Sequence, residues 1–181
     1  MVTRSLPPGR VARTVAVNQV RLPDAAWMLS TLSRIDYTDA FIVDAGVERT
    51  PEQWIKAVLE DAPLAVRAQL VAGWTALGLK LGPPWSPRRV LGWTVQRSDR
   101  HVLLLAAGSR LGLEGQLLVR RQPGGLLFAT FVALHNPAAR LVWGRMTTQH
   151  QHVVRSLLLH GARREAQRDD TKTGVHERDR A

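Results

Sequence analysis

His150 and Asp39 are the residues whose type and position give the clearest scope for chemistry. His150 lies in a segment that opens with Asn136-Pro137, a cap residue followed by a proline at the first helical position, and the predicted stop is Gly161. The segment predicts one helix of about 24 residues, or about 36 Å at the usual rise. At about 100° per residue, His150 falls in the middle of the apolar face of this helix.

A histidine inside an apolar face needs a partner, because burying an unpaired imidazole costs about 1–3 kcal/mol. Two interpretations stay open: a core histidine bonded to a backbone carbonyl or a hydroxyl, and a histidine that faces a ligand or transfers protons. The residues that share its helix face are Ala139, Trp143, Met146, Val153, Val154 and Leu157.

Asp39 belongs to a run in which Tyr37, Asp39, Phe41 and Val43 alternate with the residues between them, up to about Ala45. This alternation predicts a strand. An acid on a face with aromatic residues is either an inward, functional group or a solvated carboxylate near the start of the strand. If it reaches the same point as the histidine, the two groups can exchange protons with an enolisable substrate.

Several other kinds of chemistry are excluded or disfavoured. The chain has no cysteine, which excludes disulfides, zinc–thiolate sites and thiol nucleophiles. His150 and His152 are two residues apart and point in different directions on a helix, so we expect no metal site. Ser156 and His160 are spaced for contact, but no nucleophile elbow or orienting acid accompanies them. No glycine-rich phosphate loop occurs, and we expect no cofactor.

The rest of the sequence predicts the helices and strands that position His150 and Asp39. A capping-box sequence at Thr50 opens a helix over Pro51–Asp61, and a second helix runs from Pro63 to Gly78. Short turns then separate four strand-like segments, which predicts an antiparallel meander. These segments are Val90–Arg97, His101–Ala107, Gly115–Arg121 and Leu126–His135.

The predicted fold class is therefore α+β, with an antiparallel curved sheet wrapped on a long C-terminal helix and two shorter helices after the first strand. The last strand is apolar on both faces and needs cover on both sides, from the two shorter helices or from a second copy of the chain in a homodimer. The candidate residues of a ligand cavity between sheet and helix are Trp93, Phe128, Thr130, Trp143, Met146, His150 and Val153.

This order of elements, with the stretches Asp36-Tyr-Thr-Asp-Ala-Phe41 and Leu91-Gly-Trp93, resembles the START-related helix-grip superfamily (SRPBCC, polyketide-cyclase-like) in an uncharacterised bacterial branch. The resemblance covers about residues 35–162. It implies a cavity for hydrophobic small molecules between sheet and long helix, and family members include cyclases, dehydratases and lipid carriers. The family has six or seven strands, whereas the pattern above predicts five. Either a further strand lies within Thr14–Leu22, or the sheet wraps less far around the helix and the grip is shallow.

The leading hypothesis is binding of a lipid-like or aromatic, polyketide-like molecule in a cavity of a few hundred Å³. The first alternative is an enzyme of the cyclase or dehydratase type that uses His150 and Asp39 for proton transfer. The second is a basic interaction protein for an anionic partner, because the net charge is +10. The residues leave open whether any reaction is catalysed.

Charge also suggests the limits of the domain. Residues 1–22 carry four arginines and no acid, which predicts a flexible basic arm, and residues 163–181 carry six basic and five acidic residues, which predicts a disordered charged tail. The helix-grip domain is then residues 23–162. A nucleic-acid partner is disfavoured, since basic residues do not alternate with exposed aromatic ones. No apolar run reaches the about 20 residues of a membrane span, and we expect a cytoplasmic protein.

Overall fold

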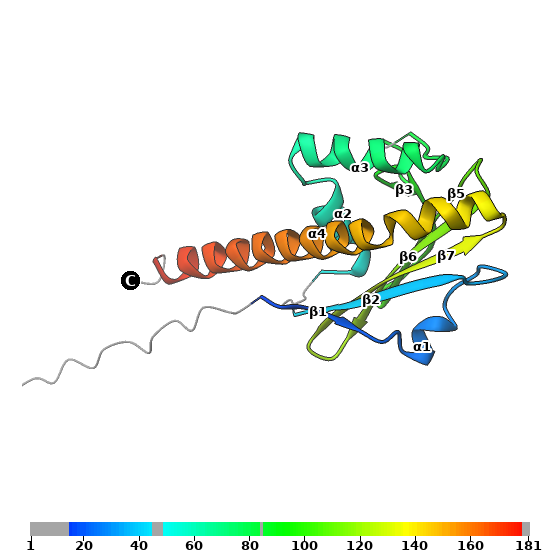
Figure 1. Cartoon of the computed structure of the whole chain (residues 1–181). Helices are drawn as coiled ribbons and strands as arrows, with labels where there is room; N and C mark the ends of the chain where they lie inside the picture. The colour runs from blue at the N-terminus through cyan, green and yellow to red at the C-terminus, as the bar shows by residue number, and fades with distance from the viewer. Residues whose placement is uncertain (1–14, 45–48, 84, 179–181) are drawn as a thin grey trace, which may run out of the picture.

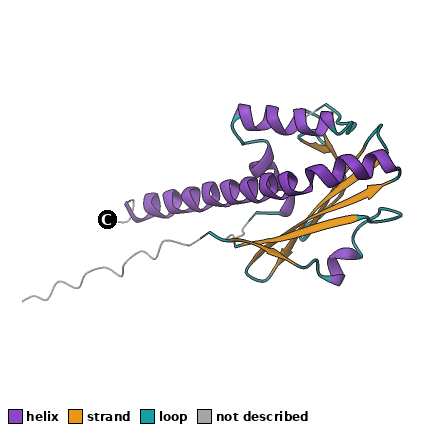
Figure 2. Ribbon diagram, in the orientation of Figure 1, coloured by secondary structure: helices purple, strands orange, loops and turns teal. Residues whose placement is uncertain are grey.

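A computed structural model gives the structure of the chain and describes residues 15–44, 49–83 and 85–178. Within these residues the fold is α+β, with one seven-stranded antiparallel sheet and four helices (Figures 1 and 2). The elements in chain order are β1 (Val17–Val20), α1 (Asp24–Trp27), β2 (Tyr37–Val43), α2 (Pro51–Leu59), α3 (Leu64–Ala76), β3 (Arg89–Val90), β4 (Trp93–Ser98), β5 (Val102–Gly108), β6 (Leu113–Gln122), β7 (Gly125–Leu134) and α4 (Pro137–Arg178).

The sheet has the order β1-β2-β7-β6-β5-β4-β3, so the last strand returns to pair with β2. In this pairing Asp39 lies opposite Thr130 and Tyr37 lies opposite Val132. On the other side of β7, Leu117 of β6 lies opposite Thr130. Because side chains alternate along a strand, directly opposed residues share one face of the sheet. The register therefore places an acid and a hydroxyl side by side on one face.

Helices α2, α3 and α4 lie on one side of the sheet, and α1 lies on the other (Figure 1). The main core fills the space between the sheet and the three helices, and it includes Phe41, Trp54 and Phe128. The caps predicted for two of these helices are present. Thr50 accepts from the backbone N–H of Gln53 in a full capping box, and Asn136 accepts from the N–H of Ala139 at 2.8 Å.

The second face of the sheet is covered by the segment that follows β1. Ala26 of α1 and Phe131 of β7 are both fully buried in this second core. The segment is held by Gln116, which is 1% exposed and bonds to Ser30 and Thr31. We expected this cover from α2 and α3 or from a second copy, and that expectation was wrong. A homodimer stays a prediction, but the face of β7 does not require it.

A further strand is present within Thr14–Leu22, which was one of the two predicted alternatives. It is β1, which pairs with β2, so this part of the expected arm belongs to the sheet. The rest of the arm, residues 1–14, lies outside the described residues. The strand predicted over Val90–Arg97 is interrupted by a two-residue turn, in which Leu91 and Gly92 have φ angles of 44° and 90°. Two consecutive positive φ angles are typical of the tight hairpin turn that joins β3 to β4.

Helix α4 continues beyond Gly161, where we expected it to end. Gly161 is not a left-handed cap. It is buried against Val58 of α2, and a Cβ atom added to it would lie 2.4 Å from Val58 Cγ2. The glycine therefore serves a close helix–helix approach rather than a stop signal.

The first residues of the expected tail are also ordered on α2. Arg164 donates to the carbonyl oxygens of Ala57 and Asp61, and Glu165 pairs with Arg49 at 2.8 Å. The prediction of a disordered tail from residue 163 was wrong for these residues, because composition alone does not show the backbone acceptors at the end of α2. Residues on both sides of 23–162 therefore take part in the fold, and the domain boundaries stay a prediction.

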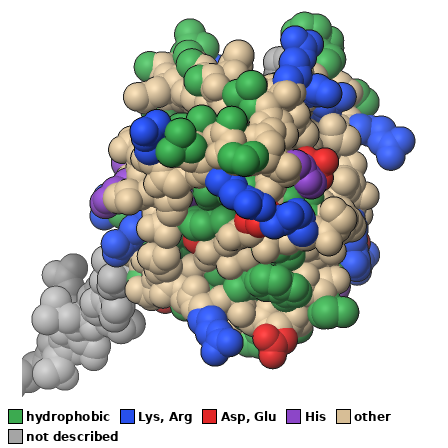
Figure 3. Space-filling model, turned by 45° about the vertical axis from the view of Figure 1, so that its right-hand side comes forward, with side chains coloured by type: hydrophobic (Ala, Val, Ile, Leu, Met, Phe, Trp, Pro, Cys, Tyr) green, Lys and Arg blue, Asp and Glu red, His purple; other side chains and the backbone are tan. Residues whose placement is uncertain are grey.

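Lys and Arg side chains are scattered among hydrophobic ones over the face shown in Figure 3, and acidic side chains there are fewer. This distribution agrees with the net charge of +10. It does not identify a partner, and an anionic partner stays a prediction.

Alanine substitution at two glycines of α4 tests the close approach of α2 and α4. Gly144→Ala meets no atom within 4 Å, so it should stabilise the protein by about 0.5–1 kcal/mol through the better helix propensity of alanine. Gly161→Ala gains the same propensity but forces Val58 to move, and should destabilise by about 1–3 kcal/mol. Urea unfolding measures both. Equal stabilisation by the two variants would contradict the close packing.

Candidate functional site

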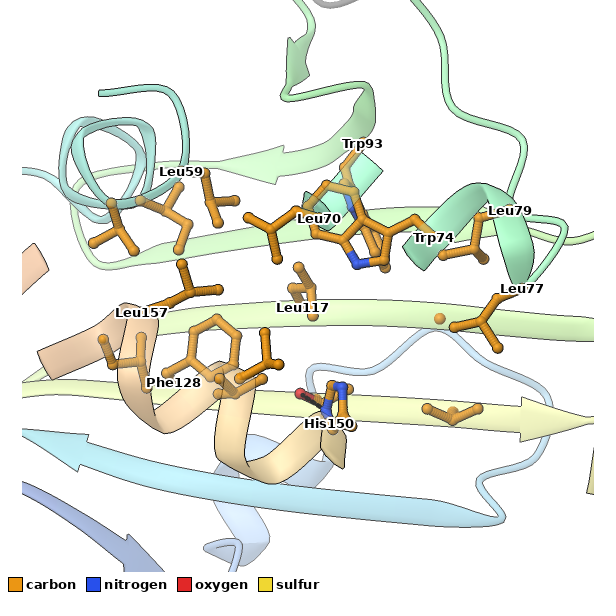
Figure 4. Close-up of a pocket in the computed structure, with 18 of the residues that line it drawn as sticks. Leu59, Leu70, Trp74, Leu77, Leu79, Trp93, Leu117, Phe128, His150 and Leu157 are labelled. Atoms are coloured by element: carbon orange, nitrogen blue, oxygen red, sulfur yellow. Dashed lines mark hydrogen bonds between the residues drawn. The ribbon is translucent and has the colours of Figure 1, made fainter. Parts of the chain in front are cut away.

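A cavity of about 80 Å³ lies between the sheet and the helices α2, α3 and α4 (Figure 4). It is smaller than the few hundred Å³ expected from the sequence, although one water needs only about 10–15 Å³. Its walls consist almost wholly of apolar side chains. The lining residues are Ile55, Val58, Leu59, Leu70, Trp74, Leu77, Leu79, Trp93, Leu113, Gly115, Leu117, Phe128, Thr130, Val132, Trp143, His150, Val153, Val154, Leu157 and Leu158.

Six of the seven predicted cavity residues line this space, namely Trp93, Phe128, Thr130, Trp143, His150 and Val153. The seventh, Met146, is partly buried against the same core without lining the cavity. Their role in binding stays a prediction. The sequence analysis did not place α3 in the wall, yet Leu70 and Trp74 come from it, and Leu77 follows it. Their spacing of four and three residues is the signal that would have found them.

Asp39 is a buried polar residue beside the cavity. Its side chain is 1% exposed, and its Oδ2 atom lies 3.1 Å from Nε2 of His150. The hydroxyl of Tyr37 donates to the same oxygen at 2.8 Å, and the side chain of Gln151 donates to the Tyr37 oxygen at 3.0 Å. The hydroxyl of Thr130 lies 3.3 Å from the same histidine nitrogen. We call these five residues the His150 cluster.

These contacts indicate which nitrogen of His150 carries a proton. A carboxylate oxygen only accepts, so the Nε2 atom beside Asp39 is assigned as the N–H donor. In a neutral imidazole the other nitrogen, Nδ1, is then an acceptor or a base. Among the described residues, no hydrogen bond reaches Nδ1. The imidazole thus has a hydrogen-bond partner inside the protein, as a core histidine would. It also lines the cavity, as a ligand-facing histidine would.

Asp39 does not itself line the cavity. It touches His150, so any effect it has on a ligand passes through the imidazole. The sequence hypothesis had both side chains meeting one substrate. The structure instead gives Asp39 the position of a residue that orients the ring and fixes its tautomer.

Burial raises the pKa of the Tyr37 phenol, and the negative charge of Asp39 and the hydrogen bond to it act in the same direction. The bond donated by Gln151 opposes them more weakly. Tyr37 therefore remains a protonated donor to Asp39. Trp143 packs against the cluster, since its ring centroid lies 5.2 Å from that of Tyr37 and 5.1 Å from that of His150.

Three indole N–H groups are buried without an acceptor, and two of them belong to residues that line the cavity. These two are Nε1 of Trp93 and Nε1 of Trp143, whereas Trp54 lies outside the lining. The Oδ1 atom of Asp39 is also buried without a partner. Buried polar atoms are nearly always satisfied in proteins, by protein, water or ligand. Three of the six such atoms in the described residues belong to residues that line the cavity or lie beside it, and the cavity is the candidate functional site.

The described residues contain no group of three or more histidine, aspartate or glutamate side chains that could hold a metal ion. No helix in the described ranges combines the length and apolar character needed to cross a bilayer. Comparison of the chain with protein-family models, curated proteins and solved structures finds no match. The helix-grip assignment and the cytoplasmic location stay predictions.

The ionisation of Tyr37 tests the cluster directly, because it is the only tyrosine in the chain. In the folded protein, tyrosinate absorbance should be absent at the pH of about 10 where a free tyrosine titrates, and it should appear in the unfolded protein. Since the folded pKa is raised, the stability that Tyr37 contributes is complete below about pH 10 and is lost as the pH rises toward the folded pKa. The Tyr37→Phe variant has no tyrosine and supplies the blank for the absorbance measurement. Native titration near pH 10 would contradict the buried bond to Asp39.

Proposed function

We propose that the protein binds a hydrophobic small molecule in the cavity between the sheet and α4. The observation that carries this proposal is the cavity itself, which is lined by apolar side chains and has the His150 cluster in its wall. Moving apolar surface from water into such a space contributes about 25 cal/mol per Å². A few polar groups in a mainly apolar pocket are typical of small-molecule sites.

The arrangement of elements supports the same proposal. Strand β2 is followed by two helices, an antiparallel meander returns β7 to the side of β2, and α4 lies over the same face as the two helices. This is the order that the helix-grip resemblance implies, and the superfamily binds hydrophobic molecules at this position. The assignment to that superfamily is part of the proposal.

The size of the cavity limits the ligand. A volume of about 80 Å³ suits a molecule of one small ring or a short chain rather than a whole lipid. A larger ligand requires a movement of α3, in which Leu70 is the one buried residue, at 8% exposed, and Leu64 is 73% exposed. Few buried contacts make an element easy to displace.

Two valines of α4 provide a matched test of cavity binding. Val153 lines the cavity and is partly exposed, whereas Val142 is 37% exposed and lies outside the lining. Fluorobenzene, followed by fluorine NMR, serves as the probe. Val153→Phe should fill the space and weaken binding about ten-fold or more, and Val142→Phe should bind like the wild type. The proposal fails if the wild type does not bind the probe, or if Val153→Phe binds it equally well.

A second candidate function is proton transfer, which the 3.1 Å contact between Asp39 and His150 favours. With Nε2 held by the carboxylate, Nδ1 is the free base. It would take a proton from the carbon next to a ketone carbonyl, and the electron pair of that C–H bond would form the enolate double bond. Asp39 is then a positioning residue, and His150 is the catalytic one.

Hydrogen exchange at a ketone tests this candidate. Cyclohexanone in deuterium oxide should lose its α-hydrogens faster with the protein than in buffer, by about 10²–10⁴-fold for a general base. His150→Gln should return the rate to that of the buffer. Asp39→Asn should lower the rate about ten-fold and change its pH profile, because the tautomer is no longer fixed.

Two results would remove the candidate. If cyclohexanone binds and its exchange rate equals that of the buffer, proton transfer is excluded while binding stands. If Asp39→Asn leaves both the rate and the pH profile unchanged, Asp39 has no positioning role.

A further inference from the structure

Helix α3 is apolar on its outer side as well as on the side that packs against the core. Its inner side carries Leu70 and Trp74, which line the cavity. On its outer side Leu64 is 73% exposed and Val71 is 37% exposed. At about 100° per residue the exposed residues near these two form one face. We call this the α3 face, and its central residues are Leu64, Ala68, Val71, Ala72 and Thr75.

The α3 face presents no polar group that requires water. Thr75 is its one polar side chain, and its hydroxyl donates to the backbone oxygen of Val71 at 2.7 Å. A surface helix normally has polar residues on its outer side, and an exposed apolar face marks an interaction surface. The helix has 13 residues, which is about 20 Å at the usual rise. It is too short to cross a bilayer, so a bilayer would contact it along its side.

The chain around the α3 face is basic. Residues 62–98 contain five basic residues and no acidic one. Lys80 and Arg110 are both exposed, and they lie at the C-terminal end of the helix, because the N–H of Arg110 donates to the carbonyl oxygen of Gly78 at 3.1 Å. The top of the molecule in Figure 3, where α3 lies in Figure 1, shows hydrophobic and basic side chains together. This combination complements a surface with negative headgroups above an apolar layer.

Two large apolar side chains are exposed in the loops beyond α3. Leu111 is 50% exposed and packs against the end of the helix, since a Cβ atom added to Gly78 would lie 2.9 Å from its Cγ atom. Trp85 is 84% exposed and lies in the loop between α3 and β3, three residues before the exposed Arg88. Tryptophan is enriched at the headgroup level of membranes, because its ring is apolar and its N–H stays hydrated.

A second copy of the chain fits this surface less well. A two-fold dimer brings the same patch of both copies together, so Lys80 and Arg110 of each copy would meet like charges. A folded partner also needs directional contacts, and the hydroxyl of Thr75 is already bonded within the helix. An anionic bilayer offers negative headgroups to the basic residues and an apolar layer to the helix, without any directional contact.

We infer that the α3 face docks on the surface of an anionic lipid bilayer. Leu64 and Val71 enter the outer part of the apolar layer, and Lys80, Arg88 and Arg110 lie at the headgroups. The inference rests on the outer side of α3 and not on the cavity, so it is independent of the proposed function.

Cosedimentation of the full chain with lipid vesicles tests the inference. The two vesicles are phosphatidylcholine alone and phosphatidylcholine with about one-third phosphatidylserine. The protein should bind the mixed vesicles about ten-fold or more tightly than the neutral ones, because each basic residue near an anionic surface contributes about five-fold. Raising the salt concentration from about 0.1 to about 0.5 M should weaken this binding by screening the charges.

Two substitutions to glutamate locate the docking face. Leu64→Glu places a charge on the α3 face, and it should weaken binding to the mixed vesicles about ten-fold or more. Leu64 is the first residue of α3, where an acid favours the helix. Met28→Glu is the matched control, because Met28 is 81% exposed and follows α1 on the other side of the sheet. It should bind like the wild type. Val71→Glu is a second variant of the α3 face if Leu64→Glu proves unfolded by circular dichroism.

Three results would overturn the inference. The first is no binding of the wild type to the mixed vesicles. The second is equal binding by the α3-face variant and Met28→Glu, which would place the contact elsewhere, such as at the arginines of residues 1–22. The third is a dimer in light scattering that Leu64→Glu abolishes, without vesicle binding, which would make the α3 face a self-association surface. Fluorobenzene binding is measured without vesicles, so the proposed function is judged separately.

Discussion

The contact between Nε2 of His150 and Oδ2 of Asp39 joins the long helix to the sheet at the wall of the cavity. Either group alone would be costly in this apolar core, since a buried polar or charged group needs a partner. Together with Tyr37, Gln151 and Thr130 they form a polar network that gives each of these side chains a hydrogen-bond partner. The network restricts how α4 can rotate over the sheet, and the apolar side chains of α4 then face β7, α2 and α3. The cavity is the space that this fixed arrangement does not fill.

The sheet topology brings the members of the network together. Tyr37 and Asp39 come from β2, Thr130 comes from β7, and His150 and Gln151 come from α4. They are close because β7 returns to pair with β2 after the helices and the meander have intervened. The direct pairing of Asp39 with Thr130 across two strands then sets an acceptor and a hydroxyl under the helix. The candidate site is therefore a consequence of long-range strand pairing and not of any local motif.

Periodicity and cap residues were sufficient to predict most of the elements, and the position of His150 on an apolar helix face predicted that it meets the core. Register was not predictable, because an alternating strand shows which residues share a face but not which residue lies opposite. For this reason the sequence did not show that Asp39 touches the histidine and stands outside the cavity. Gly161 was predicted to end the helix because glycine is common at helix ends. Its role is a close contact with Val58, which depends on tertiary packing. The cover by α1 was missed because a helix of four residues has no period to detect.

A crystal structure of the protein under xenon pressure tests the central claim most directly, because xenon enters apolar cavities. The account predicts xenon between α3, α4 and the sheet, beside Leu117 and Phe128, with Nε2 of His150 within hydrogen-bond distance of Asp39. A cavity closed by its own lining side chains, or an imidazole turned away from Asp39 into solvent, would contradict it.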